Sequence, residues 1–495
     1  MTASADTPHF VAPHNRRFVL IAAILASSMG FIDGSVVSIA IPAIRADLGA
    51  TLADAQWISN GYLLFLSSLI LLGGAAGDRF GLRNTFGLGI LVFVAASVIC
   101  ALAPTPMVLI VARAVQGIGA AFMVPGSLAI IAKAYPRDER GRAIGIWAAA
   151  SSLTTIGGPI IGGFILTLGD AGWRLVFAIN LPLGIAALAL LWFKVDADQP
   201  SESRHLDMIG AALATVSLML IAFGLTGDGS ESVPALSHVG LYAGLGVILA
   251  VAFIVWEARS KAPMLPLRLF AERSFSGANA LTLALYFALG GVMFFLPMTM
   301  IAGWGASPVE VSFALLPMGV LLTLLSSFSG GMADRYGPAP LIALGSLIVA
   351  VAFGLLGLTA PLHNIWFAVM PLIGLLGLGM GLVVSPLSTA VMTSVADADT
   401  GTASGVNNAV ARVAGLLAVA LLGAIVASVF ERALGSAAEL PIFFGLPAEG
   451  LSTEEEALRQ SATDAGFAAA AYITAGLCLV SALIAWFTLE KRRPS

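Results

Sequence analysis

Long apolar segments alternate with short polar ones along the whole chain. Most of the apolar segments run for about 20 residues, the length at which a helix crosses the hydrocarbon core of a bilayer. The pattern predicts fourteen spanning helices, near residues 18–42, 55–76, 85–103, 106–132, 143–168, 174–193, 207–226, 239–257, 275–303, 309–332, 339–359, 364–386, 402–430 and 465–488.

The composition supports this interpretation. Hydrophobic residues make up 58% of the chain and charged residues 11%, whereas soluble domains carry roughly 25% charged residues. A soluble globular protein is therefore excluded, and we expect an all-α polytopic membrane protein. The first span has no small-residue cleavage site after it, so we expect it to be retained rather than removed as a signal peptide.

Basic residues set the orientation. If both termini are cytoplasmic, 18 of the 24 Lys and Arg residues lie on the cytoplasmic side, four lie outside and two, Arg113 and Arg412, lie within spans. The positive-inside rule favours this topology over its inverse. The net charge of −4 gives no indication of nucleic-acid binding.

A short internal repeat divides the chain. The segment "GGAAGDRFGLRN" after the second span is similar to "SGGMADRYGPAP" after the tenth, 256 positions later. Transporters are often built from two such repeats around a central site. The predicted regions are a cytoplasmic tail at 1–17, a six-helix bundle at 18–193, a linker with two inserted helices at 194–273, a second six-helix bundle at 274–489 with a long outer loop at 431–464, and a cytoplasmic tail at 490–495.

Asp33 is the one acid predicted to lie deep within a span. Burial away from water favours the neutral form of a carboxyl group, so Asp33 is a candidate proton carrier. Arg113 lies at a similar predicted depth, about 10 Å from the outer end of its helix against about 13 Å for Asp33. This spacing permits contact between the two. The alternative is a structural acid that is permanently paired with a neighbouring helix.

Other polar and aromatic residues are candidates for a substrate cavity. Arg412 is close enough to the inner membrane edge either to snorkel or to line a pathway. The polar residues within spans either line the cavity or form hydrogen bonds between helices. The complete set of cavity candidates is Phe31, Trp57, Asn60, Gln116, Asn279, Asn407, Asn408 and Arg412.

Two glycine-rich motifs indicate close helix contacts. The repeated loop motif is predicted to form a conformational latch at the cytoplasmic membrane edge, from Gly74, Asp78, Arg79, Gly81 and Arg83 in the first copy and Asp334, Arg335 and Gly337 in the second. The second motif, "GGPIIGG", predicts either a packing notch or a pliable helix. Its residues are Gly157, Gly158, Pro159, Gly162 and Gly163.

The sequence shows no motif for cofactor binding or catalysis. Cys100 and Cys478 lie in apolar spans, and all five His residues lie in tails or loops, so we expect neither a metal site nor a buried His relay. No nucleotide-binding motif is present. We therefore expect no cofactor and no catalytic activity.

These motifs together resemble the major facilitator superfamily, and within it the fourteen-helix drug:proton antiporters. The resemblance rests on residues 74–84, "LIVARAVQGIGAA", "GGPIIGG", "FIDGSVVSIAIP", "WRLVFAINLPLG" and the two-helix insert. It implies alternating access, export driven by proton entry, a proton-coupling role for Asp33 and a tuning role for Arg113. The second latch copy departs from the pattern, because Ala339 and Pro340 replace basic residues.

The function predicted first is proton-coupled efflux of lipophilic small molecules, either neutral or singly charged cations, by a multi-pass protein of the cytoplasmic membrane. A second hypothesis is export of a lipid or an endogenous amphiphile, which Arg412 and the long outer loop would suit. The expected partners are a small-molecule substrate, protons and the bilayer, with no nucleic acid, and a monomer is expected. In the outer loop, Thr453 and Glu456 predict a capping box that opens a short helix, and the loop acts either as a cover or as a gate.

Overall fold

The computed structural model describes residues 11–196, 206–227, 236–435, 442–448 and 450–490. Within these ranges, fourteen helical segments are long and apolar enough to cross a membrane and no strand is present, which confirms the predicted fold class. The helices are α1 (Arg16–Leu48), α2 (Leu52–Phe80), α3 (Leu82–Ala101), α4 (Pro106–Ala134), α5 (Arg137–Leu166), α6 (Trp173–Ala178), α7 (Asn180–Lys194), α8 (Met208–Thr226), α9 (Leu236–Arg259), α10 (Arg273–Met298), α11 (Pro308–Tyr336), α12 (Pro338–Thr359), α13 (Met370–Thr393), α14 (Thr400–Leu434) and α15 (Thr453–Thr488).

Short segments complete several crossings. Helices α6 and α7 form one crossing between them, Trp173–Lys194. The π-helical segment Thr299–Gly303 extends α10, and a second one, Ile365–Val369, precedes α13. Short 3-10 turns occupy Pro13–Asn15, Asp170–Gly172, Leu267–Ala271, Ala360–Leu362 and Asp397–Asp399.

The two copies of the sequence repeat fold alike. Helix α2 begins with a capping box between Thr51 and Asp54, and α11 begins with the same motif between Ser307 and Glu310. Each helix ends at a glycine with a positive φ, 92° at Gly81 and 82° at Gly337. Side chains other than glycine rarely adopt this conformation, so the turn after each helix requires glycine.

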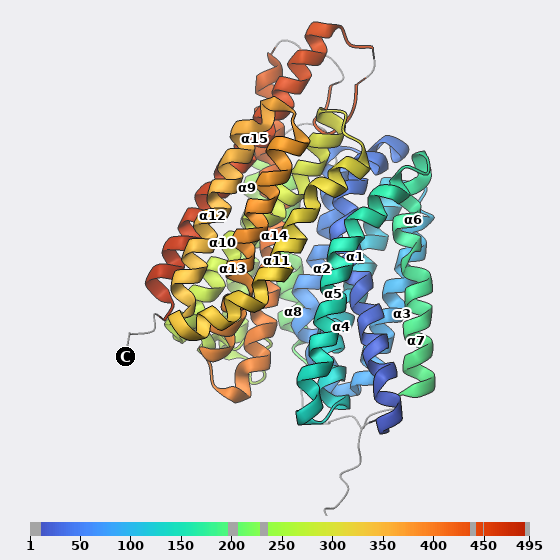
Figure 1. Cartoon of the computed structure of the whole chain (residues 1–495), viewed down its shortest axis with the longest axis vertical. Coiled ribbons are helices and arrows are strands. Elements are labelled where there is room, and N and C mark those ends of the chain that lie inside the picture. The colour runs from blue at the N-terminus through green and yellow to red at the C-terminus, as the bar shows by residue number, and fades with distance from the viewer. Residues whose placement is uncertain (1–10, 197–205, 228–235, 436–441, 449, 491–495) are drawn as a thin grey trace, which may run out of the picture.

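The helices are packed side by side in two groups (Figure 1). In the first group, α4 packs against α2 and α3, and α1 packs against α5 and α7. In the second, α10 and α12 pack against α15, and α11 packs against α13. Helix α1 begins and α15 ends at the same end of the molecule, which is the predicted cytoplasmic end.

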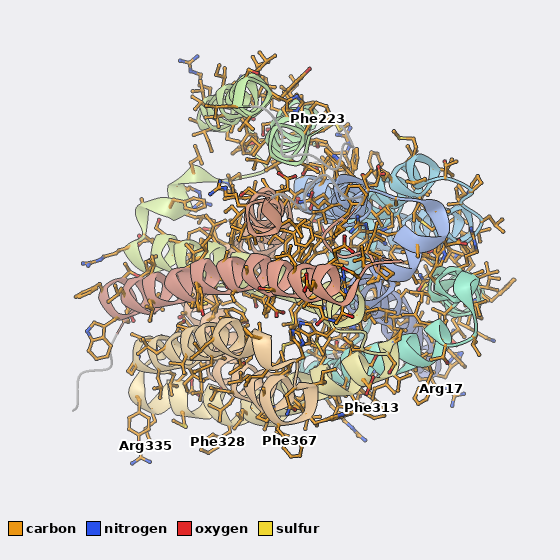
Figure 2. The ribbon with its side chains drawn as sticks, turned by 90° about the horizontal axis from the view of Figure 1, so that it is seen from above. Arg17, Phe223, Phe313, Phe328, Arg335 and Phe367 are labelled. Atoms are coloured by element: carbon orange, nitrogen blue, oxygen red, sulfur yellow. The ribbon has the colours of Figure 1, made fainter. Side chains whose placement is uncertain are left out.

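Helices α8 and α9 stand outside both groups. They pack against each other, and α8 also contacts α2 and α14, so the pair covers the seam between the two groups on one side. Seen from above, Phe223 of this pair lies on the side of the molecule away from Phe313 of α11 (Figure 2). On the Phe313 side, α11 contacts α5 across the seam, and the rings of Phe313 and Phe164 meet edge to face.

One prediction about the outer loop was wrong. The capping box lies one residue earlier than expected, between Ser452 and Glu455, and it opens no separate short helix. It opens α15 itself, which runs unbroken for 36 residues. The acidic residues 454–456 look like a loop in a hydropathy profile, but a capped first turn allows a membrane helix to extend beyond the bilayer.

Candidate functional site

A cavity of about 1520 Å³ lies between the two helix groups. Its wall combines residues of α1, α2, α4 and α5 with residues of α10, α11 and α14. Most of the lining is apolar or aromatic, and ionisable side chains are few. The lining residues include Phe31, Asp33, Tyr62, Asp78, Arg113, Asp207, Lys261, Arg268, Tyr286, Leu289, Met293, Asp399, Asn408 and Arg412.

The cavity extends to the predicted cytoplasmic end of the helices. Asp78 near the end of α2, Lys261 after α9 and Asp399 before α14 all line it there. Arg268 donates hydrogen bonds of 2.9 and 2.6 Å to the two carboxylate oxygens of Asp399, and these bonds raise the pKa of Arg268. This ion pair joins the linker that precedes α10 to the turn that precedes α14.

The opposite end of the cavity is closed by packing between the two groups. The guanidinium of Arg45, near the end of α1, donates a 2.5 Å hydrogen bond to the carbonyl of Phe444 in the outer loop. The amide of Gln56 donates a 2.6 Å hydrogen bond to the carbonyl of Val419 in α14. With the outer end closed and the cavity reaching the inner helix ends, the structure is inward-facing in the predicted orientation.

Asp33 and Arg113 form an ion pair in the cavity wall. Arg113 Nη1 lies 2.7 Å from each carboxylate oxygen of Asp33, and the side chains are only 1% and 3% exposed. Arg113 Nε donates a 3.0 Å hydrogen bond to the carbonyl of Ile58. Its guanidinium also lies over the ring of Tyr62, 4.4 Å from the centroid. The pairing that the two helix depths permitted is thus present.

Gln116 connects this pair to a wider polar network. Its amide nitrogen donates to Asp33 Oδ1 at 3.2 Å and to Ser97 Oγ at 2.9 Å, while its oxygen accepts from Arg113 at 2.6 Å. Asn180 also donates to Ser97 Oγ, at 3.3 Å. Removing any one member leaves buried polar atoms without partners, which is costly in a low-dielectric interior.

The structure places the predicted cavity residues in three kinds of position. Phe31, Asn408 and Arg412 line the cavity. Gln116 lies behind the wall in the Asp33 network, and Asn407 and Asn279 lie inside the second helix group. There Asn407 donates hydrogen bonds of 3.2 Å to Asn279 Oδ1 and 2.8 Å to Thr282 Oγ1, so these amides join α14 to α10 instead of facing the cavity.

Two further candidates do not reach the cavity either. The ring of Trp57 packs against Phe223 of α8 with 6.4 Å between centroids, so it belongs to the covered seam. Asn60 is fully buried within the first helix group, and neither polar atom of its side chain has a hydrogen-bond partner in the described part of the chain. Spacing along a helix places a residue on a face, but which neighbour covers that face depends on the packing.

The latch residues occupy the predicted cytoplasmic helix ends. Gly74 and Asp78 line the cavity mouth, and Arg83 donates to the carbonyls of Leu191 and Trp192 at the end of α7, at 3.3 and 3.0 Å. Arg79 and Arg335 each lie over the aromatic ring that follows them, at 5.4 and 5.2 Å. Asp334 lies near the end of α11, like Asp78 near the end of α2.

The "GGPIIGG" segment is a contact surface of α5 on two sides. A Cβ atom at Gly158 would meet Ser35 Oγ at 2.8 Å, and one at Gly162 would meet the side chain of Val36, both on α1. A Cβ atom at Gly163 would meet Ser312 of α11, across the seam. Gly157 faces open space, and Pro159 lines the cavity.

Two buried acids were not identified from the sequence. Asp207 and Glu257 lie at the inner ends of α8 and α9, where Trp256 Nε1 donates to Asp207 at 2.9 Å and Leu265 N donates to Glu257 at 2.9 Å. Both are buried. Hydropathy indicates depth in a membrane but not burial by neighbouring protein, so acids at span ends carried no distinguishing signal.

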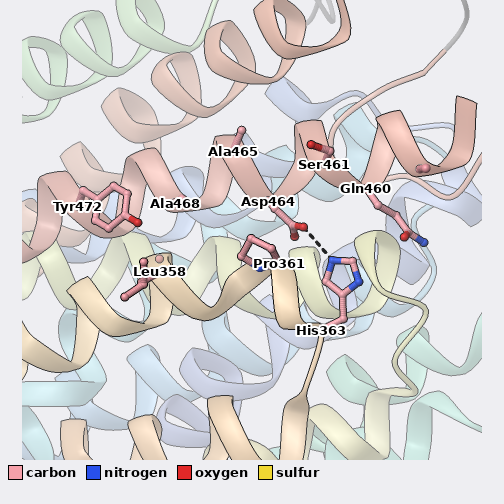
Figure 3. A pocket seen from close by; sticks show the side chains of 11 residues that line it. Leu358, Pro361, His363, Gln460, Ser461, Asp464, Ala465, Ala468 and Tyr472 are labelled. Carbon is pink, nitrogen blue, oxygen red and sulfur yellow. Dashed lines mark hydrogen bonds and ion pairs between the residues drawn. The ribbon is translucent and has the colours of Figure 1, made fainter. Parts of the chain in front are cut away.

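A second, smaller pocket of about 570 Å³ lies on the outer side between α12 and α15 (Figure 3). His363 Nε2 lies 2.8 Å from one carboxylate oxygen of Asp464, and Trp304 Nε1 donates to the other at 2.8 Å. Within the described ranges, no group of three or more His, Cys, Asp or Glu side chains is placed to hold a metal ion.

Comparison with known proteins identifies relatives over most of the chain. Residues 23–419 match the Major Facilitator Superfamily. The chain is 32% identical over 412 residues to the multidrug resistance protein B homolog of Mycobacterium tuberculosis, covering 83% of this chain and 76% of that protein. It is 34% identical over 412 residues to the methylenomycin A resistance protein of Bacillus subtilis, covering 82% of this chain and 87% of that protein.

The fold has counterparts among solved structures. A bacterial homolog of the human lysosomal transporter Spinster, in an inward-facing and unoccupied conformation, superposes with a TM-score of 0.69 over 96% of this chain and 97% of that one. The sequence identity is 18%, so this likeness concerns the fold alone.

Proposed function

Because the chain belongs to the Major Facilitator Superfamily, whose members are membrane transporters rather than enzymes, we propose that it exports lipophilic small molecules across the cell membrane in exchange for protons. The relatives named for multidrug and methylenomycin A resistance support export of foreign or toxic compounds. The large, mostly apolar cavity between the two helix groups has the size and lining that such substrates need.

The observation that carries the proton-coupling role is the buried pair of Asp33 and Arg113. Arginine keeps its charge at every physiological pH, so Asp33 is the member that takes up the proton. Protonation removes the counter-charge of Arg113 and weakens a pair that holds α1 against α4. A local charge change of this kind can bias an element with two conformations.

The proposed cycle begins in the inward-facing conformation. Asp33 releases its proton to the cytoplasm, and the substrate enters the cavity between the helix groups. The carrier then opens outward, the substrate leaves, and a proton from outside returns to Asp33. Each ligand drives its step only through its differential affinity for the two conformations. The latch residues at the ends of α2 and α11 would stabilise the closed inner side.

Export of a lipid or an endogenous amphiphile is the second candidate. The side chain of Arg412, which has no ion-pair partner among the described residues, favours this candidate, because an amphiphile with an acidic head would meet a cation in the cavity. Assays with a dye panel against lipids in reconstituted vesicles separate the two candidates.

Asp33→Asn tests the proton-coupling role. In vesicles with an imposed pH gradient, the variant should lose proton-driven dye transport, because the amide cannot carry a proton. Dye exchange without a gradient should persist and shows that the protein is folded. Asp47→Asn, at the outer end of the same helix, is the matched control and should retain gradient-driven transport. Wild-type gradient-driven transport by Asp33→Asn would refute the role.

A further inference from the structure

One face of α14 lines the central cavity. Beyond its first turn, which lines the cavity through Thr400, Gly401 and Thr402, the α14 residues in the cavity wall recur at helical spacing and lie on a single face of the helix. Most of them are small or uncharged, and Arg412 is the one charged residue among them. The α14 residues on this face are Gly401, Ser404, Gly405, Asn408, Ala411, Arg412, Gly415 and Val419.

Arg412 lies within the membrane-spanning part of α14. It is twelve positions beyond the start of the helix at Thr400, which corresponds to about 18 Å along the helix axis. With 35 residues, or about 52 Å, α14 extends beyond a hydrocarbon core of about 30 Å, so Arg412 lies in the inner half of that core in the predicted orientation. The side chain is partly exposed and faces the cavity, so it does not snorkel to the inner membrane surface.

Within the part of the chain that the structure describes, Arg412 has neither a hydrogen bond nor an ion pair. The other ionisable groups of the cavity are engaged or lie at its mouth. Asp33 is bound by Arg113, and Asp399 by Arg268. The remaining three, Asp78, Asp207 and Lys261, lie at the inner ends of the helices.

The membrane-embedded part of the cavity therefore carries one excess positive charge. When the cavity closes during transport, an arginine in this position loses contact with cytoplasmic water, and it cannot become neutral by losing its proton. A buried charge is retained where something compensates it. Here no described protein group does so, which leaves a ligand in the cavity as the compensating partner.

The surroundings of Arg412 define that ligand further. It lies within electrostatic range of the phenol groups of Tyr62 on α2 and Tyr286 on α10. Helix α10 approaches α14 one turn away, where a Cβ atom at Gly290 would meet Gly415, and the cavity-lining residues of α10 beside it, Leu289 and Met293, are apolar. We propose that Arg412 anchors an anionic group of the exported substrate, so that the preferred substrates are lipophilic, largely aromatic molecules with one acidic group.

This inference rests on the proposed export function and narrows its substrate class, away from the cations allowed by the sequence. The proposal also places the proton and the substrate at two different sites. The proton binds to the first helix group at Asp33, and the acidic group of the substrate binds to the second at Arg412. Coupling between them then runs through the conformational equilibrium rather than through competition for one side chain.

The test is direct binding of three dyes that share one fluorophore. Dansyl sulfonic acid is anionic, dansylamide is neutral, and a dansyl amide with a trimethylammonium group is cationic. Binding to the full-length protein in lipid nanodiscs is measured by fluorescence anisotropy for the wild type, Arg412→Gln, Arg412→Lys and the control Arg432→Gln. Arg432 lies on the same helix near its outer end.

Arg412→Gln should weaken binding of the anionic dye about 10- to 100-fold, as expected for loss of a charged hydrogen bond, and leave the neutral dye unchanged. Arg412→Lys should retain part of the preference, and Arg432→Gln should behave like the wild type. An equal loss for all three dyes, an unchanged anionic dye, or a wild type that does not bind the anionic dye would each overturn the proposal. Gradient-driven transport of the neutral dye by the wild type tests the export function separately.

Discussion

The two helix groups share an architecture but differ in how they hold charge. The first group buries a complete ion pair, Asp33 with Arg113, inside a network that includes Gln116 and Ser97. In the second group, neutral amide and hydroxyl contacts join α10 to α14, such as Asn407 with Asn279. Its membrane-embedded charge, Arg412, faces the cavity unpaired among the described residues.

This difference indicates a division of labour. A buried pair that is also hydrogen-bonded to its surroundings is stable until a proton neutralises its acid, so it suits a switch. An unpaired arginine in a cavity can still donate charged hydrogen bonds, so it can bind an anionic ligand. The two halves therefore differ in one property: the first holds its membrane-embedded charges as a pair, and the second holds an arginine without a partner among the described residues.

The largest expected effect comes from comparing two single variants, each of which replaces one of the two arginines by leucine. Arg113→Leu strands the carboxylate of Asp33 in the protein interior, and breaking a buried pair in this way costs roughly 3–5 kcal/mol. Arg412→Leu strands no described partner and removes an uncompensated charge, so it should not destabilise the protein. Unfolding of the purified protein in detergent measures both.

The double variant Asp33→Asn/Arg113→Leu is the control for this contrast. It should be more stable than Arg113→Leu alone, because no buried charge is left unpaired. Equal destabilisation by the two single arginine variants would contradict the division between the halves.

An intermediate effect is expected where the halves meet along α5. Gly163→Ala would place a methyl group against Ser312 of α11, and Gly162→Ala would place one against Val36 of α1. Overpacking of this kind costs about 1–3 kcal/mol, and we expect both variants to transport more slowly in vesicles. Gly157→Ala, in the same motif but facing open space, is the matched control. If all three variants behave alike, the motif acts through helix flexibility instead of close contact.

A last comparison takes one amide from each half. Gln116→Leu removes hydrogen bonds to charged groups, worth about 1.5–3 kcal/mol each, whereas Asn407→Leu removes neutral ones, worth about 0.5–1.5 kcal/mol each. Gln116→Leu should therefore lower the unfolding midpoint more. A larger loss for Asn407→Leu would show that the second helix group depends on its polar contacts more than the first.

The sequence predicted the fold and the family correctly because both rest on local signals. Runs of apolar residues mark membrane helices wherever they occur, and the structure confirms fourteen of them within the described ranges. The resemblance to the major facilitator superfamily is confirmed by the match over residues 23–419. The error at Thr453 is also local, since the adjacent Ser452 is also a helix-capping residue type and serine is preferred over threonine at that position.

The candidate site was harder to predict because it depends on which helices meet. The pairing of Asp33 with Arg113 followed from matching depths along two helices. The positions of Trp57, Asn60 and Asn279 away from the cavity could not be predicted in this way. A polar or aromatic residue in a membrane helix can contact a neighbouring helix as well as the cavity. The burial of Asp207 and Glu257 by the linker and by Trp256 is likewise a product of packing.

By itself, the sequence determined that this chain crosses a membrane, that its two halves repeat a motif, and that one acid lies deep within a span. These properties follow from composition, spacing and the cost of charge in hydrocarbon, which act on each segment separately. The packing of the helices, by contrast, pairs Asp33 with Arg113 and leaves Arg412 without a partner among the described residues. Whether a buried charge is satisfied depends on side chains brought together from distant segments, and that information exists only once the helices have packed.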